Sequence, residues 1–540
     1  MSRQPTAAPW TWSSAAIGAL VVLPVAFLVT GVLSPSTEVW AQQWRTRLPE
    51  QLVVTTGLLV GTVTGAVVLG AGLAWLVTAY RFPLSRTLSW MLILPLAMPG
   101  YILGFVMLST FGRTGAVQDQ WRSWFGTEAW FPDVESLGGA IVTFTLVLYP
   151  YVFLLARAAL RDQAGDAYQA ARTLGAGPVE AARRVVLPLL RPAVAAGGAI
   201  VAMETLTDFA TVQYFGVDTV SVGVFRVWRG TYDRDAASEL ATLVLAFALL
   251  AIGLERVARG RARFGRSAGA GGGMPPQRLR GAKGFAATAA CSTVVVLAFA
   301  GPVAQLTWWA VREQRSDRGT PLLDQYPTYL WNSLQLVAAS VAVCMVLAIL
   351  LANATRFGDR RVTRAAGRAV TVGYAVPGPV VGVGVLLFTV AVDAVLERFG
   401  WGLPGVMATG SIAVLVYAYA VRFLAPGVGA VESGLAHVPD EMTASARVLG
   451  AGPARTTWRV HLPLSGAALL TAAVLVGVDA LKELPIVLLL RPFGFDTLPV
   501  WVHGMASESR FQQAALPALS IVLVALVPVM LLSRRLERSS

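Results

Sequence analysis

Twelve apolar stretches of about 20 residues restrict the fold of this 540-residue chain more than any other feature. An α-helix rises about 1.5 Å per residue, so about 20 apolar residues cross a hydrocarbon core roughly 30 Å thick. Backbone N–H and C=O groups need partners in such a core, and a helix supplies them internally. With 55% hydrophobic and 14% charged residues, the sequence predicts an all-α polytopic membrane protein.

The predicted spans fall into two groups of six. The first six lie near residues 14–33, 53–79, 89–109, 139–158, 192–215 and 237–257. The second six lie near residues 285–310, 330–354, 369–394, 405–425, 466–490 and 512–532. The apolar run of the first span, about 19 residues long, exceeds a usual signal-peptide core, so we expect a membrane span there.

Lys and Arg residues are distributed asymmetrically between the two sides of these spans. With the N-terminus inside, the inside segments hold 29 of the 43 basic residues, and Arg422 is among those assigned to a cytoplasmic segment. Cationic residues close to a span stay on the cytoplasmic side, so both termini are predicted to be cytoplasmic. The net charge of +13 therefore indicates topology and contact with anionic membrane lipids, not nucleic-acid binding.

The chain carries a tandem duplication. "ARTLGAGPVEAARRVVLPLL" at 171–190 returns as "ARVLGAGPARTTWRVHLPLS" at 446–465, and the stretches 169–188 and 444–463 are identical at more than half of their positions. Because each half has an even number of spans, both copies keep one orientation, which predicts a parallel repeat with pseudo-two-fold symmetry. We expect a first six-helix half (1–260), a Gly- and Arg-rich flexible linker (261–284) and a second six-helix half (285–540).

The repeated polar loops, at about 162–190 and 437–465, have a pattern typical of bent helix pairs. Gly175 stands where a left-handed residue ends a helix, and Pro178 stands where proline is favoured in the first helical turn. Gly450 and Pro453 repeat this pattern. It predicts two short helices joined by a Gly-Ala-Gly elbow. Two equal elbows suit two docking sites on a soluble partner; the alternative is an ordinary cytoplasmic loop.

The loops resemble the "EAA" loop of binding-protein-dependent ABC importer permeases. The matching positions are Gly175, Val185, Leu187 and Pro188 in one copy, and Gly450, Val460, Leu462 and Pro463 in the other. In that family the loop docks into a cleft on the ATP-hydrolysing subunit. The resemblance implies a coupling role for Gln169, Ala170, Ala171, Gly175, Gly177, Pro178, Leu187, Pro188, Ala444, Ser445, Ala446, Gly450, Gly452, Pro453, Leu462 and Pro463. The name-giving Glu is absent from both copies, and the acidic residues lie one turn upstream, at Asp166 and Glu441.

Three further stretches are similar to fused twelve-span permeases of the ferric-iron uptake branch. They are "METLTDFATVQYFGVDT" (203–219), "VRFLAPG" (421–427) and "VDALKELPIVLLLRPFGFDTL" (478–498). The resemblance implies a type I ABC importer-like fold in the bacterial cytoplasmic (inner) membrane. It implies import of ferric iron, delivered by a periplasmic or extracellular binding protein, by alternating access. Related branches carry thiamine, phosphonate, polyamine, sulfate or molybdate, and these stay open as alternatives.

The chain has two lysines, Lys283 and Lys482, and neither stands in a phosphate-binding Gly-Lys-Ser/Thr sequence. The resemblance therefore implies that two copies of a separate ATPase subunit use ATP and Mg²⁺ on the cytoplasmic face. We expect this chain to bind no cofactor and to have no catalytic or firmly assigned metal site. A twelve-helix secondary transporter is a weaker alternative, because it does not require paired elbows. A membrane-embedded enzyme is weaker still, because no catalytic motif is present.

Charged residues within spans normally face a cavity, because an ionisable group in hydrocarbon is costly. Glu204 and Asp208 stand four residues apart, as do Asp479 and Glu483 at matching places of the second half. We predict that these carboxylates and Lys482 line a translocation pathway; the alternative is that they brace helices, with Lys482 neutralising one of them. Breaks in two corresponding spans provide further pathway candidates: Pro99, Gly100, Pro377 and Gly378. The alternative is that these residues only kink the helices for packing.

Cys291 and Cys344 lie in different spans, so we expect two buried free thiols rather than a disulfide. His437, His461 and His503 are scattered along the chain without metal-ligand spacing. We expect all three histidines to be ordinary surface or interface residues.

Overall fold

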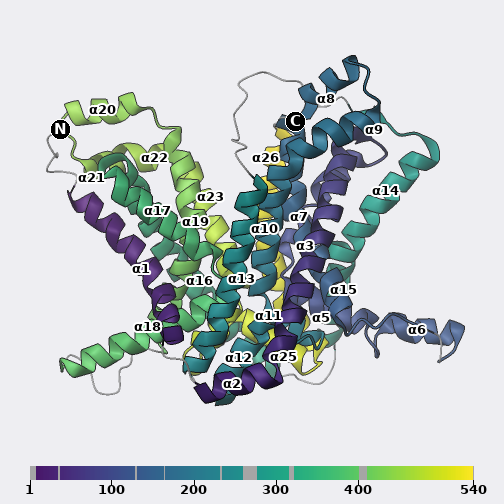
Figure 1. Cartoon of the computed structure of the whole chain (residues 1–540), viewed down its shortest axis with the longest axis horizontal. Coiled ribbons are helices and arrows are strands. Elements are labelled where there is room, and N and C mark those ends of the chain that lie inside the picture. Colours follow the sequence, from purple (N-terminus) through teal and green to yellow (C-terminus); the bar gives the residue numbers. More distant parts are fainter. Residues whose placement is uncertain are drawn as a thin grey trace. The chain divides into compact units, whose positions relative to one another are not determined.

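A computed structural model describes the chain over residues 8–33, 37–127, 130–162, 164–231, 234–259, 276–315, 321–400 and 410–538. Figure 1 shows an almost entirely helical protein. The elements up to residue 259 are α1 (Ala8–Leu33), α2 (Thr37–Thr46), α3 (Leu48–Ala79), β1 (Tyr80–Arg81), α4 (Ser85–Met91), η1 (Leu94–Ala97), α5 (Gly100–Phe111), α6 (Ala116–Phe125), α7 (Leu137–Asp162), α8 (Ala164–Thr173), α9 (Pro178–Ala181), η2 (Ala182–Val186), α10 (Leu187–Thr207), α11 (Phe209–Tyr214), α12 (Val220–Thr231) and α13 (Arg234–Arg259).

The elements after residue 275 follow a similar order. They are β2 (Gln277–Arg278), α14 (Gly281–Val295), η3 (Val296–Ala300), α15 (Gly301–Gln314), α16 (Pro321–Phe357), α17 (Arg360–Ala375), α18 (Gly378–Arg398), α19 (Ile412–Ala436), α20 (Asp440–Val448), α21 (Pro453–Thr456), η4 (Thr457–His461), α22 (Leu462–Leu464), α23 (Gly466–Lys482), α24 (Pro485–Leu490), α25 (Leu498–Ser507) and α26 (Phe511–Arg538).

Ten described helices are long and apolar enough to cross a membrane. Two further helix pairs qualify together but are bent, Ser85–Ala97 with Gly100–Phe125 by 98° and Pro453–Leu464 with Gly466–Lys482 by 82°. If each bent pair is one span, the total is the predicted twelve. The fold class is thus the predicted one, an all-α polytopic membrane protein.

The long helix α3 shows why such sequences form lipid-facing helices. Its buried residues recur every three or four positions from Leu48 to Leu73, which is the spacing of one helix face. Val53, Val60 and Val68 on other faces are largely exposed although they are apolar. In a bilayer those exposed valines contact lipid, so one side of α3 packs against protein and the other against hydrocarbon.

The chain divides into two compact units that do not coincide with the two halves of the sequence. Unit 1 contains residues 1–42, 224–245 and 320–501, and unit 2 contains residues 43–223, 246–319 and 502–540. In unit 1, α1 packs on α16, α17 and α18; in unit 2, α14 packs on α4, and α15 packs on α5 and α26. Each half of the sequence thus contributes its first span to the unit formed mainly by the other half.

Each unit has a core of three mutually packed helices. The core of unit 2 contains α3, α7 and α10, and that of unit 1 contains α16, α19 and α23. A matching pair of hydrogen bonds supports their equivalence: Val220 N donates to Thr55 Oγ1 (3.1 Å) in unit 2, and Leu498 N donates to Ser333 Oγ (2.8 Å) in unit 1. The sequence offset from Val220 to Leu498 equals the offset from Thr55 to Ser333. The duplication thus extends to individual polar contacts.

The tenth predicted span lies farther along the chain in the structure. The tenth span, predicted at 405–425, is α19 at Ile412–Ala436, because the Ser411 side chain accepts a hydrogen bond from Val414 N and caps the helix there. Residues 401–409 lie outside the described part of the chain.

The end of the predicted linker 261–284 is structured: Gln277–Arg278 pairs in parallel with Tyr80–Arg81, and α14 begins at Gly281. Strand pairing there supplies backbone partners that composition alone does not reveal. The rest of the linker, 261–275, lies outside the described residues. Cys291 and Cys344 are free and buried, as expected.

Candidate functional site

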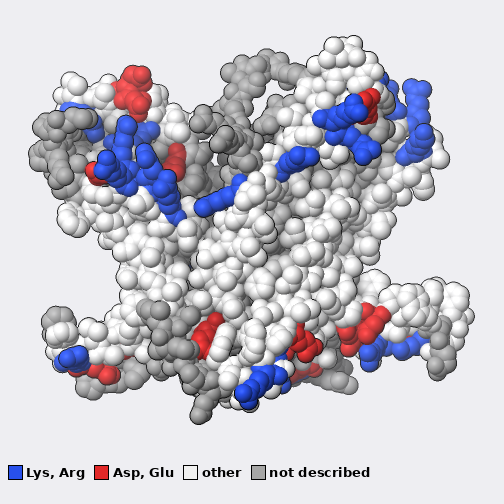
Figure 2. Space-filling view, viewed as in Figure 1, with Lys and Arg blue, Asp and Glu red and all other residues white. Residues whose placement is uncertain are grey.

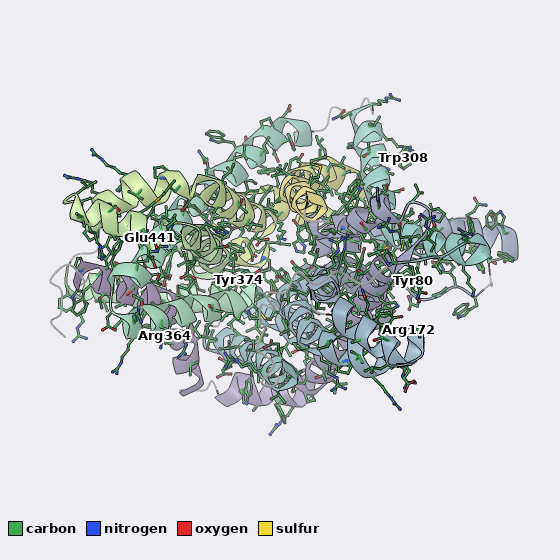
Figure 3. All side chains as sticks on the ribbon, turned by 90° about the horizontal axis from the view of Figure 1, so that it is seen from above. Tyr80, Arg172, Trp308, Arg364, Tyr374 and Glu441 are labelled. Atoms are coloured by element: carbon green, nitrogen blue, oxygen red, sulfur yellow. The ribbon has the colours of Figure 1, made fainter. Side chains whose placement is uncertain are left out.

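The first predicted elbow has the geometry that its glycine and proline require. Gly175 follows α8 with φ +91°, a left-handed conformation that glycine adopts without a steric penalty. Gly175 N donates to Arg172 O (3.1 Å) and Ala176 N donates to Ala171 O (3.0 Å), which closes the C-terminus of the helix. Pro178 then begins α9. The Arg172 side chain, labelled in Figure 3, donates to Ala176 O (2.6 Å).

The second elbow repeats this geometry. Gly450 has φ +80°, Gly450 N donates to Arg447 O (3.0 Å), and Ala451 N donates to Ala446 O (2.9 Å). Pro453 begins α21. The left-handed glycines and initiating prolines that the sequence predicts are therefore present in both copies.

Each elbow presents apolar side chains. Leu174 is 88% exposed in the first, and Val448 and Leu449 are 88% and 86% exposed in the second. Gln169 and Ala170 on α8 are exposed, and so are Ala444 and Ser445 on α20. An exposed apolar patch rimmed by polar residues is typical of a docking surface.

A π-helical turn follows each elbow. Leu187 N bonds back to Ala182 O, and Leu462 N bonds back to Thr457 O, five residues earlier in both cases. Pro188 and Pro463 come next, and a proline ring clashes with the carbonyl four residues before it. The wider π turn avoids that clash. The repeated Leu-Pro sequence therefore begins α10 and α22 directly after a π turn. The third described π turn, Val296–Ala300, also ends two residues before a proline, Pro302.

A buried polar cluster fixes the second loop to the end of α16. His461 Nδ1 lies 2.8 Å from Asn353 Oδ1, His461 Nε2 lies 3.1 Å from Thr443 Oγ1, and Thr457 Oγ1 donates to Asn353 Oδ1 (3.0 Å). Arg356 donates to Leu435 O (2.6 Å). His461 is fully buried inside the chain, so the expectation of an ordinary surface or interface residue is wrong. Its partners on α16 are distant in the chain and were not visible in the sequence.

The first loop has different residues at the corresponding places. At the offset that relates Gly175 to Gly450, Asn353, Thr443 and His461 correspond to Thr78, Tyr168 and Val186. Tyr168 packs edge-on against Trp75, with ring centroids 6.4 Å apart. The Thr78 hydroxyl is buried without a hydrogen-bond partner among the described residues. The two loops therefore share their elbow but differ in how they are attached.

Asp208 in unit 2 connects two broken helices. It ends α10 and begins α11, where Oδ1 accepts from Thr211 N (2.9 Å) and Oδ2 from Thr211 Oγ1 (2.6 Å). A Cβ added at Gly100, the first residue of α5, would collide with Asp208 Oδ2. The carboxylate therefore lies against the N-termini of both α11 and α5, where helix dipoles favour negative charge. Glu204, one turn earlier, is half-buried.

Glu483 has the equivalent place in unit 1. Its Oε1 accepts from Ile486 N (3.2 Å) at the start of α24, and its Oε2 lies 3.3 Å from Arg422 Nε. Both side chains are 6% exposed. Arg422 Nη1 also donates to Val376 O (3.0 Å), just before Pro377. The assignment of Arg422 to a cytoplasmic segment is therefore wrong, because this residue lies within α19 and binds a buried carboxylate.

Both predicted helix breaks are present with nearly equal backbone angles. Pro99 has φ −59° and ψ 144°, Pro377 has φ −58° and ψ 146°, and each is followed by a helix that begins with glycine, Gly100 or Gly378. Protein groups satisfy nearby carbonyls: Arg422 binds Val376 O, and Tyr149 Oη donates to Leu92 O (2.9 Å).

Asp479 and Lys482 form the most accessible charged pair of the candidate pathway. Lys482 Nζ lies 2.9 Å from Asp479 Oδ1, and the side chains are 24% and 26% exposed. Lys482 thus neutralises Asp479, while its neighbour Glu483 pairs with Arg422. Asp208 and Glu483 thus connect helices through hydrogen bonds and an ion pair. Glu204, Asp479 and Lys482 remain the charged candidates for the pathway.

His503 was also expected to be a surface or interface residue, but it is buried inside the chain. Its Nδ1 lies 3.0 Å from Tyr214 Oη, and its ring packs edge-on against Phe209, with centroids 5.8 Å apart. His437 is exposed, as expected. Within the described ranges, no three His, Cys, Asp or Glu side chains lie close enough together to hold a metal ion.

Comparisons with known proteins agree with the duplicated architecture. The family described as "Binding-protein-dependent transport system inner membrane component" matches residues 66–256 and again residues 344–540. The chain is 24% identical over 527 residues to the Fe(3+)-transport system permease protein FbpB 2 of Haemophilus influenzae, covering 95% of this chain and 96% of that protein.

Two shorter relatives match less than half of the chain. The sulfate transport system permease protein CysT of Salmonella typhimurium is 30% identical over 46% of this chain and 89% of its own length. The molybdenum transport system permease protein ModB of Escherichia coli is 27% identical over 40% of this chain and 97% of its own length. The longer relative therefore matches both halves, whereas each shorter one matches about one half.

The family match covers well over half of the chain, in two copies joined within one polypeptide. The spans, the duplicated cores and the two elbows all fit that assignment. The chain thus belongs to the binding-protein-dependent transport system inner membrane components, as a fused two-half permease of an ABC importer and a multi-pass inner-membrane protein.

Proposed function

We propose that this permease imports ferric iron by alternating access, driven by ATP hydrolysis in separate subunits. Two ATPase copies bind the elbows at Gly175 and Gly450 and use ATP and Mg²⁺; this chain itself binds no nucleotide. A soluble binding protein delivers the ion from the outer face. The substrate assignment rests mainly on the match to a ferric-iron permease, which extends over 95% of the chain.

The paired elbows support the docking of two ATPase copies. Each has a left-handed glycine, a proline-initiated helix and exposed apolar side chains next to the bend. A docking partner buries such side chains and gains hydrophobic free energy of about 25 cal/mol per Å² of apolar area. Two sites of one shape fit two copies of one partner.

Charge supports a cytoplasmic location of the elbows. In Figure 2 many of the blue Lys and Arg side chains of each unit gather at the end that carries its elbow. Cationic residues near spans are retained in the cytoplasm. This distribution also supports cytoplasmic termini and an outer-face site for the binding protein.

Oxyanions are the second candidate cargo, because the two shorter relatives are named for sulfate and molybdenum transport. Thiamine, phosphonate and polyamine remain further alternatives from the sequence. Uptake of radiolabelled ferric iron should be measured in cells that lack the chromosomal gene and carry it on a plasmid. Unlabelled ferric salt is expected to compete, whereas sulfate, molybdate, thiamine, phosphonate and polyamine are not. Competition by one of these solutes and not by ferric salt would reassign the cargo.

The docking proposal has a matched glycine control outside the elbows. Gly175→Val and Gly450→Val force a β-branched residue into a left-handed conformation, which distorts the bend. Gly253 in α13 has open space around it and no positive φ, so Gly253→Val is expected to be tolerated. An ATPase subunit should co-purify in detergent with wild type and with Gly253→Val, and not with the valine pair Gly175→Val and Gly450→Val. Retention by the valine pair at wild-type level, with the fold intact, contradicts docking at the elbows.

A further inference from the structure

A groove in unit 1 carries three arginines that the transport mechanism does not use. It has a volume of about 560 Å³ and lies between α17, α19 and the end of α16. Arg360, Arg364 and Arg368 line one side of it, and Glu432 on α19 lines another. A groove of this size accommodates a small ligand or a lipid headgroup.

The three arginines form one row. Their spacing of four residues places them on one face of α17, over about 12 Å of helix length. All three are exposed, and none makes an ion pair with any residue that the structure describes. Figure 3 labels Arg364 and, farther along the same helix, Tyr374. With Glu432 opposite, the groove has a net charge of about +2. One negative charge on a ligand would halve this charge, and two would neutralise it.

Donors for an anion come from the arginines alone. The three threonines that line the groove donate to their own helices: Thr355 to Ala352 O, Thr363 to Asp359 O and Thr371 to Gly367 O. The N-terminus of α17 is capped by the Asp359 side chain, which accepts from Arg361 N and Val362 N. Guanidinium groups bind phosphate oxygens in bidentate geometry, so phosphate is the ligand chemistry that fits best.

A purely topological role does not explain the row. The two halves can be aligned in this region by matching the break residues Pro99 and Pro377. In that alignment the three arginines of the row correspond, in order, to Phe82, Arg86 and Trp90 of the first half. Only one of these three residues of the first half is basic. If the row served only to keep this end of the helix in the cytoplasm, the first half would need a similar row, because both halves have the same predicted orientation. The row of three arginines occurs only in the second half.

We propose that the groove lined by Arg360, Arg364, Arg368 and Glu432 is a binding site for a phosphate-bearing anion. The phosphate belongs either to an anionic phospholipid or to a soluble phosphate. A neighbouring apolar cavity of about 430 Å³ along the preceding turns of α19, lined also by α1 and α16, offers space for an acyl chain. Arg356, next to Thr355 of the groove, binds Leu435 O and approaches Thr443 in the second loop, so the site lies close to that loop.

The two phosphate sources are separated by the probe. The full chain in detergent is titrated with dioleoylphosphatidylglycerol, with dioleoylphosphatidylcholine as the neutral control, and bound lipid is counted by native mass spectrometry. Inorganic phosphate is titrated separately by calorimetry. Selective retention of phosphatidylglycerol assigns a lipid, and binding of inorganic phosphate assigns a soluble ligand. Binding of neither probe overturns the proposal.

Variants test the residues. Arg364→Gln is expected to weaken binding about fivefold, because each cation near a membrane surface contributes a factor of about five. Replacing all three arginines by Gln is expected to weaken binding about a hundredfold, since the three factors multiply. Arg361→Gln is the matched control, since Arg361 lies on the same helix but does not line the groove. Glu432→Gln is expected to strengthen binding several-fold, because it removes the opposing charge. If Arg361→Gln weakens binding as much as Arg364→Gln, or Glu432→Gln weakens it, the site assignment is wrong.

Discussion

Arg422 and Glu483 form a buried ion pair, with Nε and Oε2 3.3 Å apart, that connects α19 to the break between α23 and α24. Arg422 also binds Val376 O, and Glu483 also accepts from Ile486 N. One pair thus satisfies backbone groups at two helix breaks. In a membrane, irregular backbone is tolerated where protein groups supply such partners.

Removing one member of this pair is expected to destabilise the protein more than removing both charges. Arg422→Met leaves a buried carboxylate, and breaking a buried pair in this way costs about 3–5 kcal/mol. The double variant Arg422→Met with Glu483→Gln keeps an acceptor for Ile486 N and removes the uncompensated charge. Thermal unfolding in detergent should rank the double variant between wild type and Arg422→Met. A double variant as unstable as the sum of the two singles would show that the residues do not act as a pair.

Gly100 is expected to tolerate no side chain, because a Cβ there collides with Asp208 Oδ2. Gly100→Ala should cost about 1–3 kcal/mol of stability, the usual cost of overpacking. Gly72→Ala in α3 is the control, because a Cβ at that position meets no atom within 4 Å. Thermal unfolding of the two variants measures the difference. Equal melting temperatures would mean that Asp208 does not lie against α5.

Asp208→Asn tests whether Asp208 caps a helix or lines the pathway. Asn also accepts from the Thr211 amide, so folding and uptake should both remain within about twofold of wild type, whereas Asp208→Ala should cost about 1 kcal/mol. Uptake of radiolabelled iron and thermal unfolding are measured together. A large loss of uptake by a stable Asp208→Asn protein would instead place the charge in the pathway.

The features predicted from sequence were those set by local backbone chemistry. Gly175 and Gly450 adopt positive φ, and Pro178 and Pro453 begin helices, because each residue restricts its own backbone. The repeat made these elements visible twice. The apolar runs similarly located the spans, because a bilayer requires a minimum helix length.

The features that were missed depend on partners far away in the chain. His461 and Asn353 are 108 residues apart, and the partner of Arg422 lies in the break between α23 and α24. A basic residue near the predicted end of a span has the same sequence signature whether it faces the cytoplasm or a buried carboxylate. The exchange of first spans between units was also invisible, because α1 has no charge or motif that identifies its partner helices.

The polar cluster at His461 is expected to hold the second elbow more firmly than the first. Asn353→Leu removes the acceptor shared by His461 and Thr457 and leaves their polar groups buried, at a cost of about 1–3 kcal/mol. Hydrogen exchange of residues 440–452 should become faster in this variant. The first loop is an internal control, because the cluster's hydrogen bonds join α16 to the second loop. Faster exchange in both loops would indicate global destabilisation rather than release of one elbow.

The Asp479–Lys482 pair is expected to reveal the sign of the cargo's charge. The pair is partly exposed, so its loss should change stability by no more than about 1 kcal/mol. For a cationic cargo, Asp479→Asn leaves Lys482 unopposed and should slow uptake about fivefold, since a unit charge at about 4 Å contributes about 1 kcal/mol even in water. Lys482→Met should then slow uptake less, or not at all. For an oxyanion the order reverses, with Lys482→Met the slower variant. Asp133→Asn, which alters an exposed carboxylate paired with Arg113, is the matched control. Uptake rates unchanged in both pathway variants would remove this pair from the route of the substrate.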